Sequence, residues 1–198
     1  MNKYIFMAVL ALILCAGMQT YAEEQDEVLQ TIEEAVKQYK AGEYADAASN
    51  LDYASQLVRQ QKSEKIKQLL PGPLPGWKAE QPVAQAFGSA VLGGGVTVSR
   101  EYTRGNSSMS VEIVSDSPVL ESVIIMLNTP MFAGAGGGKL ERVKGQKSII
   151  KYDSSQQDGD IYIVVDGRFL VTVKGHKVSR EELISLAGSI HFTRLSEN

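Results

Sequence analysis

The sequence predicts an α+β fold in which an antiparallel helical hairpin is followed by an antiparallel β-sheet domain with helices packed on the sheet. Two observations support this prediction. Residues 24–70 lack Pro, are rich in Ala, Glu, Gln, Lys and Leu, and are interrupted once by Gly42, which favours two helices. The later part of the chain alternates apolar and polar residues around short turn dipeptides, which is typical of strands. The expected element order there is ββ-α-ββ-ββ-α.

The first 22 residues have the pattern of a cleaved secretory signal. Lys3 supplies a positive start, residues 5–16 are apolar, and a small-x-Ala site ends at Ala22. The apolar run is shorter than the roughly 20 residues that a membrane-spanning helix needs. We therefore expect cleavage after Ala22, a periplasmic or secreted location, and no stable membrane insertion of the remaining chain.

Composition excludes several classes of function. The only cysteine is Cys15, so the chain after Ala22 has no thiol for disulfides, nucleophilic catalysis or metal binding. A net charge of −3 with interspersed acids and bases gives no field for nucleic acid. We expect a helical hairpin over 23–70, a Pro/Gly linker over 71–76 and a sheet domain over 77–198.

The helical hairpin carries apolar residues at helical spacing on both sides of Gly42. The joint, Tyr39-Lys40-Ala41-Gly42-Glu43-Tyr44, is followed by Ala47, Leu51 and Ala54, and this pattern resembles one tetratricopeptide-type hairpin. The resemblance implies close packing of two helices through small residues. Because such repeats usually need about three copies to bury a continuous core, this hairpin must pack on its own sheet domain or recruit a partner chain.

The first strands of the sheet domain are predicted at 96–103 and 108–115, turning at Gly105-Asn106. In this register Val98 faces Ile113 and Tyr102 faces Met109. Arg100 lies on the same apolar face, where a buried guanidinium needs a partner, unless its charge reaches the sheet edge. Residues 83–95 are rich in Ala and Gly and carry no clear assignment.

Two helices and two further strands follow by the same reasoning. A helix over 118–128 begins with Pro118 at its first turn, and strands at 139–143 and 146–153 turn at Lys144-Gly145. Ser179 and Glu182 form a predicted capping box for a last helix that extends to Ile190.

The clearest strand signal is the hairpin at 159–175, which turns at Asp166-Gly167. A two-residue turn would pair Val165 with Arg168. It would place one apolar set on the face that receives both predicted helices: Tyr162, Val164, Phe169, Val171 and Val173. The other face would carry Ile161, Ile163, Val165 and Leu170, either covered by the N-terminal helices or open as a binding surface.

No motif indicates catalysis, a cofactor or a metal site. The Gly-rich run 134–138 before Lys139 lacks the spacing and the following helix of a phosphate loop. Asp153, Asp158 and Asp160 do not have calcium-loop spacing and are interpreted as a solvated turn. The two histidines are too few for a zinc site.

The sequence therefore favours a non-catalytic secreted or periplasmic accessory or protein-interaction module, with another periplasmic protein as the expected partner. The alternative is a carrier of a small apolar or amphiphilic ligand, held between the sheet and the loop around Met131 and Phe132. The predicted ligand or partner surface comprises Arg100, Phe132, Ile161, Ile163 and Leu170. The oligomeric state is left open.

Overall fold

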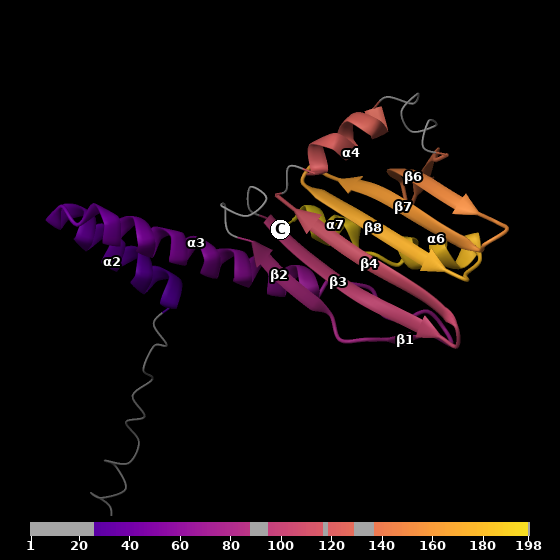
Figure 1. Cartoon of the computed structure of the whole chain (residues 1–198), viewed down its shortest axis with the longest axis horizontal. Helices are drawn as coiled ribbons and strands as arrows, with labels where there is room; N and C mark the ends of the chain where they lie inside the picture. The colour runs from indigo at the N-terminus through magenta and orange to yellow at the C-terminus, as the bar shows by residue number, and fades with distance from the viewer. Residues whose placement is uncertain (1–25, 88–94, 117–118, 129–136, 198) are drawn as a thin grey trace, which may run out of the picture.

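The computed structural model describes residues 26–87, 95–116, 119–128 and 137–197. It has the predicted α+β architecture, with a helical hairpin before an antiparallel eight-stranded sheet (Figure 1). Within these residues, no helix is both long and apolar enough to cross a membrane.

The hairpin consists of α2 (Glu27–Ala41) and α3 (Tyr44–Lys67). The Asp26 carboxylate accepts a hydrogen bond from the Val28 amide at 2.9 Å and caps the start of α2. Gly42 ends the helix in the left-handed conformation, with φ of 83°, which glycine adopts without steric cost. The two predicted helices and their joint are confirmed.

The sheet begins with two short strands, and the second of them lies in the region that sequence patterns left unassigned. Both β1 (Lys78–Ala79) and β2 (Val83–Phe87) pair with the same edge of β3 (Gly95–Arg104). From β3 the order continues through β4, β8, β7 and β6 to β5, and every pairing is antiparallel. The remaining strands are β4 (Ser107–Ser115), β5 (Lys139–Val143), β6 (Gln146–Asp153), β7 (Asp158–Val165) and β8 (Phe169–His176).

Two of the three predicted strand hairpins have the expected register. Val98 pairs with Ile113 and Tyr102 with Met109 between β3 and β4. The β5–β6 turn places Lys144 and Gly145 at φ of 49° and 84°, as a type I′ turn requires.

The predicted register of the β7–β8 hairpin is wrong by one residue. Asp166 and Gly167 do have positive φ, and the Arg168 amide donates to the Val165 carbonyl at 3.1 Å. Arg168 is nevertheless left out of the ladder, so that Val165 pairs with Phe169 instead. A one-residue shift transfers a whole strand to the opposite face. Consequently Phe169, Val171 and Val173 share a face with Ile161, Ile163 and Val165.

The prediction that both later helices pack on one face is also wrong. Helix α6 (Arg180–Gly188) and helix α7 (Phe192–Ser196) contribute to the main core beneath Ile161 and Ile163. Helix α4 (Val119–Asn128) lies on the other face, where Val123 packs with Ile149, Tyr162 and Val164. Figure 1 shows α6 and α7 behind the sheet and α4 at its upper edge. The sheet therefore separates two apolar layers of unequal size.

Two paired glycines allow α6 to approach the sheet closely. Gly159 of β7 lies directly across from Gly175 of β8. A Cβ atom built on Gly175 would be 2.4 Å from Val178 Cγ2 and 2.8 Å from Leu183 Cδ1. Leu183 is completely buried over this glycine pair. The predicted capping box is confirmed, because the Glu182 amide donates to Ser179 Oγ and the Ser179 amide donates to Glu182.

The helical hairpin joins the sheet domain only through the end of α3. Ile66, Leu69 and Leu70 belong to the main core, and the Lys62 ammonium pairs with the Asp116 carboxylate at 2.5 Å. The outer part of the hairpin projects beyond the sheet (Figure 1). The sheet face that carries Ile161 and Ile163 is therefore covered in part by the end of α3, together with α6 and α7, and not by the outer part of the hairpin.

Candidate interaction surface

The residues proposed from sequence as one surface do not come together. Ile161 and Ile163 are both 0% exposed and belong to the main core. Leu170 is also buried and occupies the opposite face, paired with Val164. Phe132 lies outside the described residues. The register shift in β8 separates these isoleucines from Leu170.

Arg100 has a structural partner that the sequence did not identify. Its Nε atom donates to the Glu80 carbonyl at 2.9 Å, and Nη1 donates to the Pro71 carbonyl at 3.2 Å. The Tyr102 hydroxyl donates to the same Pro71 oxygen at 2.7 Å. Arg100 and Tyr102 therefore fasten both ends of the segment 71–80 to β3.

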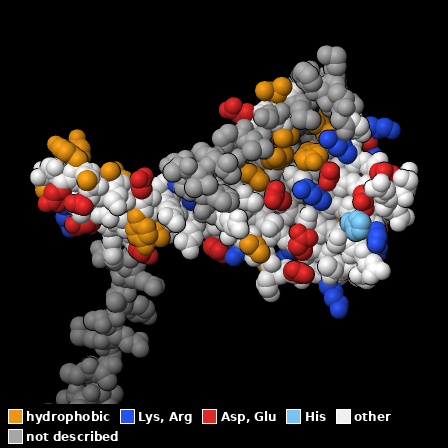
Figure 2. Space-filling model, viewed as in Figure 1, with side chains coloured by type: hydrophobic (Ala, Val, Ile, Leu, Met, Phe, Trp, Pro, Cys, Tyr) orange, Lys and Arg blue, Asp and Glu red, His pale blue; other side chains and the backbone are white. Residues whose placement is uncertain are grey.

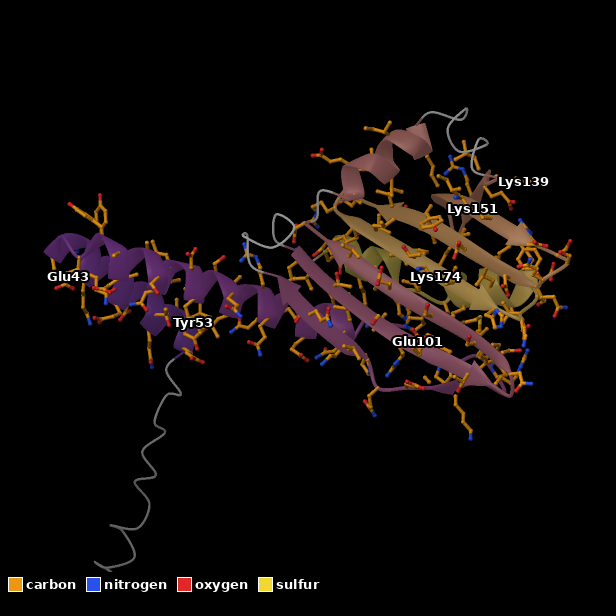
Figure 3. All side chains as sticks on the ribbon, viewed as in Figure 1. Glu43, Tyr53, Glu101, Lys139, Lys151 and Lys174 are labelled. Carbon is orange, nitrogen blue, oxygen red and sulfur yellow. The ribbon has the colours of Figure 1, made fainter. Side chains whose placement is uncertain are left out.

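The sheet face on which α4 packs also carries a polar row, away from α4, with charges of both signs on neighbouring strands. Cross-strand pairing aligns Glu101, Ser110, Lys174, Asp160 and Lys151 in one row over five strands. Three of these residues are labelled in Figure 3. A shallow hollow of about 340 Å³ lies over this row. Opposite charges placed side by side neutralise one another, so the row has no net field for a charged ligand.

Glu101 is the member of this row whose ionisation is perturbed. Burial of its carboxyl raises its pKa, the nearby Glu80 and Glu112 raise it further, and Lys174 partly opposes them. Among the residues that the structure describes, no nucleophile or histidine is hydrogen-bonded to Glu101, and the carboxyl lies on an open face of the sheet from which water is not excluded.

The aspartates around Gly159 each have a local role. Asp153 accepts hydrogen bonds from the Ser155 amide and hydroxyl at 2.8 and 2.6 Å. Asp158 accepts from the Lys177 amide and lies 2.9 Å from His176 Nδ1. In the part of the chain that the structure describes, no three such side chains gather as metal ligands would. These contacts organise the ends of β6 and β8.

The helical hairpin has small residues inside and large apolar residues outside. Ala35, Ala47 and Ala54 are 2–3% exposed, and with Val28 they form the buried contact between α2 and α3. Seven larger apolar residues are 37–66% exposed, and we call them the apolar stripe: Leu29, Ile32, Val36, Tyr39, Tyr44, Leu51 and Val58. Their spacing places them along one face of each helix.

Both helices contribute to the same side of the hairpin. The rings of Tyr39 and Tyr44 meet edge to face, with centroids 5.5 Å apart, where the two halves of the stripe join. Figure 2 shows hydrophobic side chains exposed at the outer end of the hairpin. Spacings of three, four and three residues in α2, and of seven in α3, match the repeat by which helices pack on other helices.

The opposite side of the hairpin is held by polar contacts. Asn50 Nδ2 donates to Gln38 Oε1 at 2.8 Å, and the Tyr53 hydroxyl donates to Glu27 Oε1 at 2.8 Å. Tyr53 is 46% exposed and is labelled near the start of α2 in Figure 3. These bonds satisfy polar groups within the chain, whereas the apolar stripe has no covering element in the described structure.

Sequence reasoning identified most of these residues as helical apolar positions and expected small residues between the helices, but it did not recognise the large residues as an exposed stripe. The signal was present, because alanines and large residues occupy adjacent stripes on both helices. Comparisons of the chain with protein-family models, with curated proteins and with solved structures give no significant match. The apolar stripe is therefore judged on its geometry alone.

Proposed function

We propose that this protein is a non-catalytic secreted or periplasmic interaction module whose projecting helical hairpin binds a protein through the apolar stripe. The observation that carries the proposal is the packing of alanines between the helices, with large apolar residues directed outward. The exposed apolar surface, on the order of 600 Å², is at the upper end for the largest patch on a typical monomer. A partner of matching apolar character would remove it from water.

Point variants test this proposal better than removal of the hairpin. Deleting residues 23–70 would also remove Ile66, Leu69 and Leu70 from the core. We suggest photo-crosslinking in the source cells from position 51, first in the otherwise unchanged chain and then together with Val36→Glu. The proposal predicts a discrete cross-linked protein that Val36→Glu abolishes.

Tyr53→Ser is the matched control. Tyr53 and Val36 are almost equally exposed, at 46% and 45%, but they lie on different sides of the hairpin. Loss of the cross-link in both variants, or in neither, would contradict binding through the apolar stripe.

A second candidate function is a carrier of an anionic amphiphile. A hollow of about 290 Å³ lies beside α4, with Ile124 and Val164 supplying apolar walls and Arg142 and Lys147 supplying positive charge. This combination suits an acyl or aromatic body with an acidic head. Native mass spectrometry of protein purified from its own source tests the carrier function, and absence of any copurifying molecule together with no binding of anilinonaphthalene sulfonate would rule it out.

A further inference from the structure

We infer that the occupant of the apolar stripe is the helical hairpin of a second copy of this chain, and that the two hairpins form an antiparallel four-helix bundle. This inference rests on the proposed function and names its partner. The two-fold axis would pass between the copies at the level of Leu51, so that α2 faces α2 and α3 faces α3 of the second copy.

The apolar stripe is symmetric about that level. Helix α2 ends at Ala41 and α3 begins at Tyr44, so Glu34 and Leu51 lie at the same height, seven residues from the joint. On α2, Leu29 and Tyr39 are five residues from Glu34, and Ile32 and Val36 are two residues from it. On α3, Tyr44 and Val58 are each seven residues from Leu51. The apolar residues of both helices are therefore centred at the same height along the hairpin.

A two-fold axis at this centre pairs every residue of the stripe with an apolar residue. Leu51 meets its own counterpart, and Tyr44 meets Val58 of the second copy. On α2, Leu29 meets Tyr39 of the second copy, and Ile32 meets Val36 of the second copy. Such self-complementarity is what an isologous interface requires. Spacings of three, four and three residues, or of seven and seven, are symmetric about their own middle in any such repeat, so the specific observation is that the middles of the two helices lie at the same level of the hairpin.

The projecting length also fits this arrangement. Gly42 lies nine residues before Leu51, so the tip of the second hairpin would reach the level of Gln60. At about 1.5 Å per residue, this level lies only two residues before Lys62, whose ammonium pairs with Asp116 of the sheet domain. The second hairpin therefore covers the whole projecting part without overlapping the sheet domain along the helix axis.

Burial and charge agree with the pairing. The second copy would cover all seven side chains of the apolar stripe, which are 37–66% exposed in one chain. At each end of the stripe, the axis places Lys40 opposite Val28 of the second copy, two residues from the Asp26 carboxylate of that copy. Lys40 and Asp26 are both exposed, and Lys40 has no ion-pair partner in the described chain.

Engineered cysteines test the register directly. In a Cys15→Ser background the chain has no other cysteine. Leu51→Cys should form a disulfide between copies under mild oxidation, because the two Cα atoms face each other across the axis. Tyr44→Cys and Val58→Cys should each cross-link poorly alone but efficiently when the two chains are mixed and re-equilibrated. Tyr53→Cys, on the other side of the hairpin, should remain unlinked.

Sedimentation measurements on the uncross-linked full chain complete the test. We expect a mass twice that of the monomer for the wild type and for Tyr53→Ser, and the monomer mass for Leu51→Glu. A Leu51→Glu chain with unchanged far-ultraviolet circular dichroism would show that the hairpin still folds, since position 51 is exposed in the monomer.

The possible failures separate the two proposals. A wild type that is monomeric at every concentration overturns self-association, and a Val36-dependent cross-link to a different protein would then leave the proposed function intact. Stripe-dependent flotation with phospholipid vesicles, without dimer formation, overturns both. A dimer that persists in Leu51→Glu overturns the assignment of its interface to the apolar stripe.

Discussion

Tyr102 links the segment after the helical hairpin to β3, which is next to the edge of the sheet. Its ring is completely buried, and its hydroxyl donates to the Pro71 carbonyl at 2.7 Å. Burial raises the pKa of the Tyr102 phenol to about 12, although the nearby Arg100 opposes that rise. The hydroxyl therefore remains a donor over the whole physiological pH range.

Tyr102→Phe should lower the free energy of unfolding by about 1 kcal/mol, because one buried hydrogen bond is lost. The Pro71 carbonyl keeps its bond from Arg100 Nη1, which limits the loss. Urea unfolding at neutral pH measures the change. Tyr53→Phe is the control, since the hydrogen bond from Tyr53 to Glu27 is exposed and its loss should leave the free energy of unfolding almost unchanged. Equal losses in the two variants would contradict this account.

Glu101 should make stability depend on pH in the opposite direction from a paired carboxylate. Its pKa is raised by burial and by Glu80 and Glu112, so the folded protein holds this proton more tightly than the unfolded chain. The favourable contribution is complete below the ordinary carboxyl pKa of about 4.3 and is lost as pH rises through the folded value.

Glu101→Gln should therefore stabilise the protein at pH 7 by a few tenths of a kcal/mol, a small value because the side chain is largely exposed. The advantage should disappear in acid, below about pH 4. Urea unfolding at several pH values checks this. Glu181→Gln, at an exposed helix position, is the control and should give no such trend. Destabilisation by Glu101→Gln at pH 7 would contradict the mechanism.

At the scale of the element, α6 depends on the glycine pair beneath it. Gly175→Ala would place a methyl group within van der Waals overlap of Val178 and Leu183. We expect a loss of about 1–3 kcal/mol, as for other overpacked cores. Thermal and urea unfolding measure it.

Gly188→Ala is the matched control at the end of the same helix. Nothing lies within 4 Å of a Cβ atom there, and alanine restricts the unfolded chain and favours helix. The expected gain is about 0.4–1 kcal/mol. Similar effects of Gly175→Ala and Gly188→Ala would show that close packing is not the cause.

The bounds and pairing of strands could be predicted where the alternation of apolar residues and the turn residues indicated the same hairpin. The bounds of β5 and β6, and the pairing of Val98 with Ile113, follow from local alternation and from Gly-containing turns. The register of β8 did not follow, because one extra turn residue, Arg168, leaves the local pattern almost unchanged while reversing its faces. Apolar residues on both faces of β7 and β8 removed the signal that would have corrected the error.

Features that depend on contacts between distant parts of the chain could not be predicted from local sequence patterns, for a different reason. β1 and β2 are defined by pairing with β3, and neither has enough alternation of its own. Helix α4 packs with Tyr162 and Val164, as predicted, whereas α6 and α7 lie on the opposite face. The apolar stripe was visible as periodicity, and small residues were expected between the helices, but only the packing shows that Val36 and Leu51 are outside.

At the scale of the whole molecule, α3 connects two regions with different stabilities. Its end joins the main core through Ile66, and the Lys62 ammonium also lies 5.4 Å from the centre of the Phe169 ring. Its first half is held to α2 mainly through alanines, which contribute little apolar area. A lone hairpin of this kind should open locally far more easily than the central strands.

Self-association makes a specific prediction for that difference. In native-state hydrogen exchange, amides of α2 and of the first half of α3 should become more protected as protein concentration rises, because only the dimer covers the apolar stripe. Amides of β4 and β8 should show no such dependence, since the sheet core is complete in one chain. In Leu51→Glu, hairpin protection should be low at every concentration while sheet protection is unchanged. Strong hairpin protection that is independent of concentration in both proteins would mean that the alanine contact alone stabilises the hairpin, and the physical reason for a second copy would be lost.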